Sequence, residues 1–125
     1  MSLAENRVLR RLRDIADAIA QIEVMLDGKT YDDFRSDRIL RAAYERFIEI
    51  ISEASRHIPA ELQAKAPEVP WARVRAIGNP LRHAYHEIDG ETLWNIYSSG
   101  ELAILGKAVR QLIEIAGRGD ENDRR

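Results

Sequence analysis

Residues 8–26, VLRRLRDIADAIAQIEVML, decide the fold class of this chain. Aliphatic side chains recur there at alternating spacings of four and three residues, which puts them on one face of an α-helix. The members of this apolar face are Val8, Leu12, Ile15, Ile19, Ile22 and Leu26. Asp27-Gly28 follows, and Gly28 suits the left-handed conformation that commonly ends a helix. The stretch therefore predicts a long amphipathic first helix.

The remaining sequence has helical periodicity as well. A capping-box pattern at Thr30–Asp33 offers one start for the second helix, and Asp37 offers another. The other predicted features are a stop at Pro59, a short turn at 61–65, and helices from Trp71, over 81–86, over 91–97 and over 101–116. Because no segment alternates with a period of two, we expect an all-α protein, an up-and-down bundle of about four main helices plus short helices. Residues 1–117 would form one domain and 118–125 a flexible C-terminal tail.

The composition excludes several classes of protein. A length of 125 residues suits a single domain, and the absence of cysteine excludes a disulfide framework, thiol catalysis and a cysteine-based zinc site. With 19 Lys and Arg against 21 Asp and Glu, the net charge of -2 excludes an overall basic surface but allows a local basic patch. No apolar run approaches the roughly 20 residues of a membrane span, and the first residues lack a signal-peptide core. We therefore expect a cytoplasmic protein.

The most chemically distinctive residues lie in 78–86, GNPLRHAYH. Gly and Pro inside a helix cost roughly 1 and 3 kcal/mol relative to Ala, so Gly78-Asn79-Pro80 either separates two helices or marks a functional site. Three arginines and no acidic residue lie between Val69 and His86, namely Arg73, Arg75 and Arg82. This local charge of at least +3 fits a phosphate-bearing partner, although carboxylates from elsewhere in the fold could neutralise it.

Asn79 lies one helical turn before His83, and Arg82 and Tyr85 are close to His83 in sequence. Their functional groups suffice for RNA cleavage without a metal. A base removes the proton of the ribose 2′-OH, an acid protonates the leaving oxygen, and a cation stabilises the phosphorane. The alternative is a buried histidine whose hydrogen bonds are satisfied in the core. His83 and His86 share a helical face, but no carboxylate stands at a ligand spacing from them, so we expect neither a metal nor another cofactor.

Four stretches together resemble the HepT-like branch of the HEPN superfamily, a group of small all-helical proteins. They are YDDF at 31–34, AYERFIEIISEA at 43–54, PEVPW at 67–71, and Gly78-Asn79 with His83-Ala84-Tyr85, which Ile88-Asp89 and Trp94 follow. The resemblance covers residues 5–116. It implies a metal-independent endoribonuclease toxin of a type VII-like HEPN/MNT toxin–antitoxin pair, acting as a homodimer. It also implies a minimal nucleotidyltransferase (MNT) antitoxin as partner, which silences the toxin by transferring AMP to Tyr85.

The leading hypothesis gives each motif residue a role. His83 is the acid/base, Asn79 orients its imidazole or contacts phosphate, and Tyr85 positions the substrate. Arg82 is the catalytic cation that stabilises the phosphate charge, with Arg75 as its substitute. The residues expected to bind RNA phosphates are Arg75, Arg73 and His86. Because each chain has one motif histidine, a two-fold dimer would bring two His83 side chains together, one as base and one as acid.

One position departs from the family pattern. Gly78 stands where the family signature has an arginine directly before the asparagine. Arg82 or Arg75 could supply the missing charge. Alternatively, the nuclease activity is weakened or lost, and a non-catalytic module that binds a nucleotidyltransferase partner or a nucleotide remains. A third hypothesis is a plain helical dimer in which the motif serves only for packing.

Overall fold

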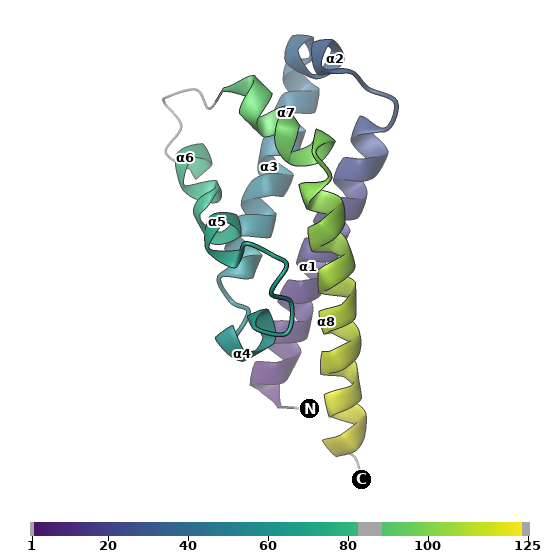
Figure 1. Ribbon diagram of the computed structural model, residues 1–125, viewed down its shortest axis with the longest axis vertical. Coiled ribbons are helices and arrows are strands. Elements are labelled where there is room, and N and C mark those ends of the chain that lie inside the picture. Colours follow the sequence, from purple (N-terminus) through teal and green to yellow (C-terminus); the bar gives the residue numbers. More distant parts are fainter. Residues whose placement is uncertain (1, 83–88, 124–125) are drawn as a thin grey trace.

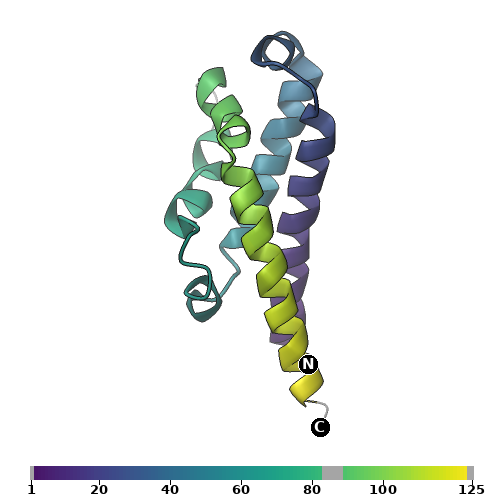
Figure 2. The ribbon, with the colours of Figure 1, turned by 45° about the vertical axis from the view of Figure 1, so that its right-hand side comes forward.

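The computed structural model describes the backbone of residues 2–82 and 89–123, and the side chains of residues 2–81 and 89–118. Within these ranges the ordered elements are all helices, as the sequence predicts. Three long helices lie side by side in both views of the ribbon, namely α1 (Leu3–Leu26), α3 (Arg38–Ser55) and α8 (Glu101–Asp123) (Figures 1 and 2). The shorter helices are α2 (Tyr31–Ser36), α4 (Ala60–Gln63), α5 (Trp71–Ala76), α6 (Gly78–Arg82) and α7 (Gly90–Ser98).

The apolar face of α1 forms the centre of the bundle. Its members from Leu12 to Leu26 are at most 1 % exposed, and they pack against α3 on one side and α8 on the other. Burial of each such aliphatic side chain is worth roughly 1.5–3 kcal/mol. Gly28 has a φ of 72°, so the left-handed end predicted for this helix is confirmed.

Both candidate starts of the second helix are used. The side chain of Thr30 accepts from the Asp33 amide (3.1 Å) and the Asp33 carboxylate accepts from the Thr30 amide (2.9 Å), which starts the short α2. The Asp37 carboxylate then accepts from two amides at the start of α3. The sequence pattern offers these two caps as alternative starts of one helix. The structure has two successive helices, α2 and α3, because each cap starts its own.

An aromatic cluster attaches α2 and α7 to the upper part of α3. The ring of Phe34 lies 5.3 Å from that of Tyr44 and 5.5 Å from that of Trp94. The buried hydroxyl of Tyr44 donates to the Leu93 carbonyl at 2.5 Å. Burial raises the pKa of this phenol, so Tyr44 stays protonated and remains a donor. The cluster thus fixes the position of α7, which is the first helix described after the motif region.

The last helix ends later than the sequence predicts. α8 continues to Asp123, past the expected end at Ala116, so the segment assigned to a C-terminal tail is helical up to that residue. Gly117 costs about 1 kcal/mol relative to Ala inside a helix, which is why the sequence favours an earlier end. The pair between Arg118 and Glu114, 3.3 Å apart and four residues apart in the sequence, favours continuation.

Candidate functional site

The motif region contains a break between two short helices, and it lies one residue earlier than predicted. α5 ends at Ala76 and α6 begins at Gly78, with Ile77 between them. Of the two alternatives that the sequence leaves open for Gly78-Asn79-Pro80, a separation of two helices is confirmed to within one residue, and the second helix begins at Gly78 instead of the predicted residue 81. Pro80 lies in the first turn of α6, where the backbone amides have no helical acceptor, so its missing N–H removes no hydrogen bond.

Ser52 of α3 holds this break together. Its side chain is completely buried, and its hydroxyl donates to the Arg75 carbonyl at 2.8 Å while it accepts from the Gly78 amide at 3.1 Å. One hydroxyl thus satisfies an acceptor at the end of α5 and a donor at the start of α6. Because the buried Gly78 amide needs an acceptor and the Arg75 carbonyl accepts from Ser52 as well as from Arg56, Ser52 fixes how α5 and α6 meet on the surface of α3.

Arg56 brings a guanidinium to the motif asparagine. It lies four residues after Ser52 and caps the end of α3. Its Nη2 donates to the Asn79 side-chain oxygen at 2.5 Å and to the Arg75 carbonyl at 3.3 Å. The side chain is 36 % exposed, and its Nη1 lies 4.0 Å from the Glu53 carboxylate. The exposed amide of Asn79 and the half-buried guanidinium of Arg56 therefore face solvent together.

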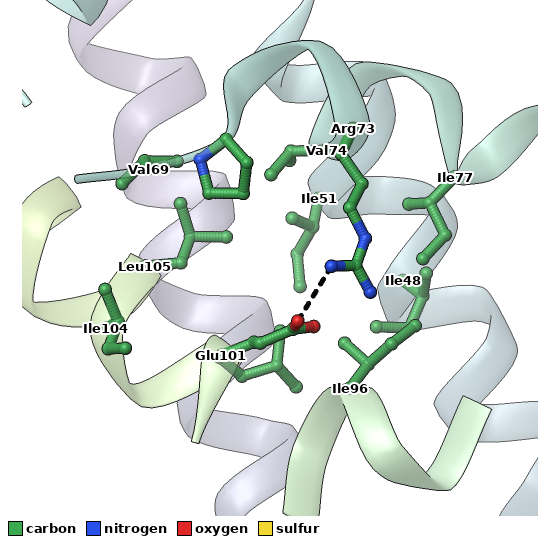
Figure 3. Close-up of a pocket in the computed structure, with 12 residues that line it drawn as sticks. Ile48, Ile51, Val69, Arg73, Val74, Ile77, Ile96, Glu101, Ile104 and Leu105 are labelled. Atoms are coloured by element: carbon green, nitrogen blue, oxygen red, sulfur yellow. Dashed lines mark hydrogen bonds and ion pairs between the residues drawn. The ribbon is translucent and has the colours of Figure 1, made fainter. Parts of the chain in front are cut away.

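The two arginines of α5 point in different directions. The guanidinium of Arg75 reaches toward α4, where its Nη1 donates to the Gln63 side chain at 2.8 Å. The backbone carbonyl of Arg75 instead faces Ser52 and Arg56. Arg73 instead forms an ion pair of 2.8 Å with Glu101 of α8, across an apolar pocket between α5 and α8 (Figure 3). The structure brings Asn79 together with Arg56, whereas Arg73 is engaged with a different helix.

Several predicted site residues cannot be placed in this geometry. His83, Tyr85 and His86 lie outside the described residues, as does the side chain of Arg82, whose backbone ends α6. Sequence reasoning missed Ser52 and Arg56. The only signal for them was their spacing of four residues on one face of α3, and nothing local connects that face to a motif 23 residues further along the chain.

The groups that surround Asn79 suit the binding of an anion. The guanidinium of Arg56 lies beside Asn79, and the Glu53 carboxylate, which lies 4.0 Å from Arg56 and 3.4 Å from His57, offsets part of its charge. Within the described ranges, no three His, Asp or Glu side chains come together so as to hold a metal ion. Across the helices that the structure describes, none combines the length and the apolar character that a bilayer-spanning helix needs.

Comparison with known proteins identifies the family. A family model described as "Ribonuclease HepT-like" matches residues 15–114. A protein named "Probable ribonuclease HepT" from Thermococcus cleftensis is 35% identical over 96 residues, which are 77% of this chain and 87% of the relative. "Putative RNase MJ1380" from Methanocaldococcus jannaschii is 35% identical over 94 residues, 75% of this chain and 86% of the relative. No solved structure matches the chain. The chain belongs to the HepT-like ribonuclease family.

Proposed function

We propose that this protein is a metal-independent endoribonuclease whose catalytic groups gather around α6. Membership of the HepT-like ribonuclease family supports RNA as the substrate. The observation that carries the proposal is the contact between Arg56 and Asn79, which brings a guanidinium next to the motif position where this chain has Gly78 in place of the family's arginine. Gly78 removes a side chain from that position, and Arg56 supplies the charge from α3.

The reaction follows from these groups. His83 of one protomer removes the proton of a ribose 2′-OH, and the 2′ oxygen attacks the adjacent phosphorus. The bond from phosphorus to the 5′ oxygen breaks, and a second imidazole protonates that oxygen, which leaves a 2′,3′-cyclic phosphate on one product. Arg56 and Arg82 stabilise the additional negative charge on the phosphorane. Asn79, held by Arg56, orients the imidazole or contacts the phosphate oxygen.

A homodimer completes this scheme. Each chain has one histidine in the motif, whereas the reaction uses an acid and a base in the same step. A two-fold axis beside α6 supplies both, because it places equivalent residues of two copies opposite each other. Light scattering on the purified protein tests the stoichiometry, and a monomer that cleaves RNA at the same specific rate at all concentrations would refute it.

The biological role that we propose is that of a toxin controlled by a nucleotidyltransferase. The partner transfers AMP to the hydroxyl of Tyr85, with release of pyrophosphate from ATP, and the modified side chain blocks the site. Intact-mass measurement after co-expression with a candidate nucleotidyltransferase tests the transfer. The expected result is a set of AMP mass increments that Tyr85→Phe removes, and an unmodified wild-type chain that nevertheless loses its toxicity would refute it.

The decisive experiment is RNA cleavage by pure protein in EDTA. His83→Ala should lower the rate at least ~10²-fold, which is the smallest contribution typical of a general acid or base. Arg118→Ala, which changes an exposed side chain of α8 far in sequence from the motif, is the matched control and should cleave at the wild-type rate. Equal cleavage by His83→Ala and wild type would defeat the assignment.

A second candidate function is a non-catalytic module that binds a nucleotidyltransferase partner or a nucleotide. Gly78 favours it, because the position of the signature arginine has no side chain at all. If this candidate is right, the wild-type protein does not cleave RNA under any condition, and His83→Ala binds the partner as well as the wild type does. Growth arrest on expression, relieved by Arg82→Ala, favours the nuclease instead.

A further inference from the structure

The first half of α1 carries an excess of positive charge that the candidate nuclease site does not use. Between residues 2 and 16 the chain has four arginines and two acidic residues, a local balance of +2 in a chain with a net charge of -2. The core needs none of these arginines, because the apolar face of α1 lies on the other side of the helix.

Three of these arginines line one surface hollow. Arg7, Arg10 and Arg11 surround a hollow of about 580 Å³, together with His57, which lies two residues after the end of α3. Asp14 is its one acidic lining residue. We call this surface the α1–α3 basic face. A concave surface lined by one sign of charge concentrates the field and attracts ligands of the opposite sign.

These arginines are not engaged in ion pairs. Among the residues that the structure describes, no carboxylate lies within 4.0 Å of the side chains of Arg7, Arg10 or Arg11, whereas Arg35, Arg46 and Arg118 each pair with a neighbour. Single surface arginines without a pair are common. Three in one hollow keep their guanidinium forks available for phosphate oxygens, which such forks bind in bidentate geometry.

The basic face connects to the candidate nuclease site through α3. His57 lines the hollow, and the preceding residue, Arg56, donates to Asn79. Both residues follow directly after α3, which ends at Ser55, and Arg56 contacts α6 whereas His57 lines the hollow beside α1. Figure 1 shows the same order, with α3 between α1 and the α5–α6 pair. The Glu53 carboxylate lies 4.0 Å from Arg56 and 3.4 Å from His57, so a negative charge also lies where the basic face meets the candidate site.

We propose that the α1–α3 basic face binds the phosphate backbone of the RNA strand outside the position where it is cleaved. The proposal rests on the RNA substrate of the proposed function. A strand whose scissile phosphate lies at Asn79 continues over the end of α3, and its further phosphates meet Arg7, Arg10 and Arg11. The contacts are to phosphates only, so they contribute affinity and register without a preference for particular bases.

The test measures binding separately from cleavage. The probe is a single-stranded RNA of about 20 nucleotides with 2′-O-methyl groups, which cannot be cleaved because the 2′-OH is blocked. The triple variant Arg7→Gln/Arg10→Gln/Arg11→Gln is compared with Arg35→Gln/Arg38→Gln/Arg118→Gln, which loses the same charge elsewhere. Arg and Gln have similar helix propensities, so both variants should fold, which thermal melting checks.

Fluorescence anisotropy over a range of KCl concentrations gives the result. A single strand contributes about 0.7 to the salt slope of log K for each phosphate contact, so loss of three contacts should lower the slope by about 2. The control variant should keep the wild-type slope. With a long cleavable RNA, the basic-face variant should raise KM and leave kcat unchanged.

The outcomes separate this proposal from the proposed nuclease. Equal salt slopes for the two triple variants would overturn the basic face even if the wild type cleaves RNA. A lower slope in the basic-face variant supports it even if the wild type proves inactive as a nuclease. An unchanged slope with an altered oligomeric state, or with lost binding of an acidic protein partner, would overturn it and assign the surface to protein contacts.

Discussion

Replacement of Ser52 by Ala tests the joint between α3, α5 and α6. The hydroxyl is the acceptor for the Gly78 amide and a donor to the Arg75 carbonyl. The first amide of a helix has no intrahelical acceptor, so the variant leaves the Gly78 N–H buried and unpaired, at a cost of ~1–3 kcal/mol. The Arg75 carbonyl keeps its second donor, Arg56, so its loss is smaller. We expect a total destabilisation of ~2–3 kcal/mol.

Ser55→Ala is the matched control for this experiment. Ser55 is as buried as Ser52 and lies on the same helix, but its hydroxyl donates only to the Ser52 carbonyl within α3, at 2.6 Å. Its loss should cost ~1 kcal/mol or less, because such local bonds compete with the helix that contains them. The assay is equilibrium unfolding in urea. With a slope of roughly 1–3 kcal/mol per molar, Ser52→Ala should lower the midpoint by about 1 M.

The comparison between the two serine variants carries the conclusion. A Ser52→Ala protein no less stable than Ser55→Ala would refute the joint, since a buried water or a small shift would then satisfy both backbone groups. RNA cleavage adds a second readout, because Ser52→Ala should reduce activity even at urea concentrations where the protein stays folded.

Three further predictions follow from single contacts. Arg56→Ala should lower kcat/KM for RNA cleavage about 10²-fold, with Arg56→Lys recovering part of the charge but not the fork, and full activity of Arg56→Ala would contradict its role. Tyr44→Phe removes a buried donor from the Leu93 carbonyl and should cost ~1–3 kcal/mol in urea unfolding, whereas an unchanged midpoint would contradict it. Hydrogen bonds from the Thr30 backbone and side chain lower the pKa of Asp33. The stabilisation that this carboxylate gives is therefore present above its pKa in the unfolded chain and is lost as the pH falls through its lower pKa in the folded protein. Asp33→Asn should remove this part of the acid dependence of unfolding, and a pH profile identical to that of the wild type would count against it.

The sequence predicts the long elements of this fold well, because each carries a periodic apolar face and a recognisable cap. The face of α1, the capping box at Thr30 and the left-handed Gly28 all occur as predicted. Boundaries set by weak or opposed preferences are less predictable. Gly117 argues for an early end of α8, and the helix nevertheless continues, since a cost of about 1 kcal/mol is easily offset.

The candidate site was only partly accessible from sequence, for a physical reason. Asn79 could be found because it lies one helical turn before His83 and between Gly78 and Pro80, two residue types that are unfavourable in the interior of a helix. Arg56 could not, because an arginine at the end of a helix is ordinary, and its role arises only when tertiary packing brings α6 against α3. The same holds for Ser52, whose hydroxyl matters only once two helix ends meet it.

In this chain, the arginine that lies at the motif does not come from the motif sequence. Position 78 is glycine, and the guanidinium beside Asn79 belongs to Arg56. In the proposed mechanism, phosphate binding needs a guanidinium beside Asn79, and Arg56 brings one there from the end of α3 although residue 78 has no side chain. The consequence is a new dependence, because Arg56 caps α3 and follows Ser52 by one turn. The last turn of α3 must therefore stay helical for the helix joint to be satisfied and for the guanidinium to reach Asn79. Fraying of that turn would weaken the packing of α5 and α6 and, in the proposed mechanism, would also remove the guanidinium from Asn79.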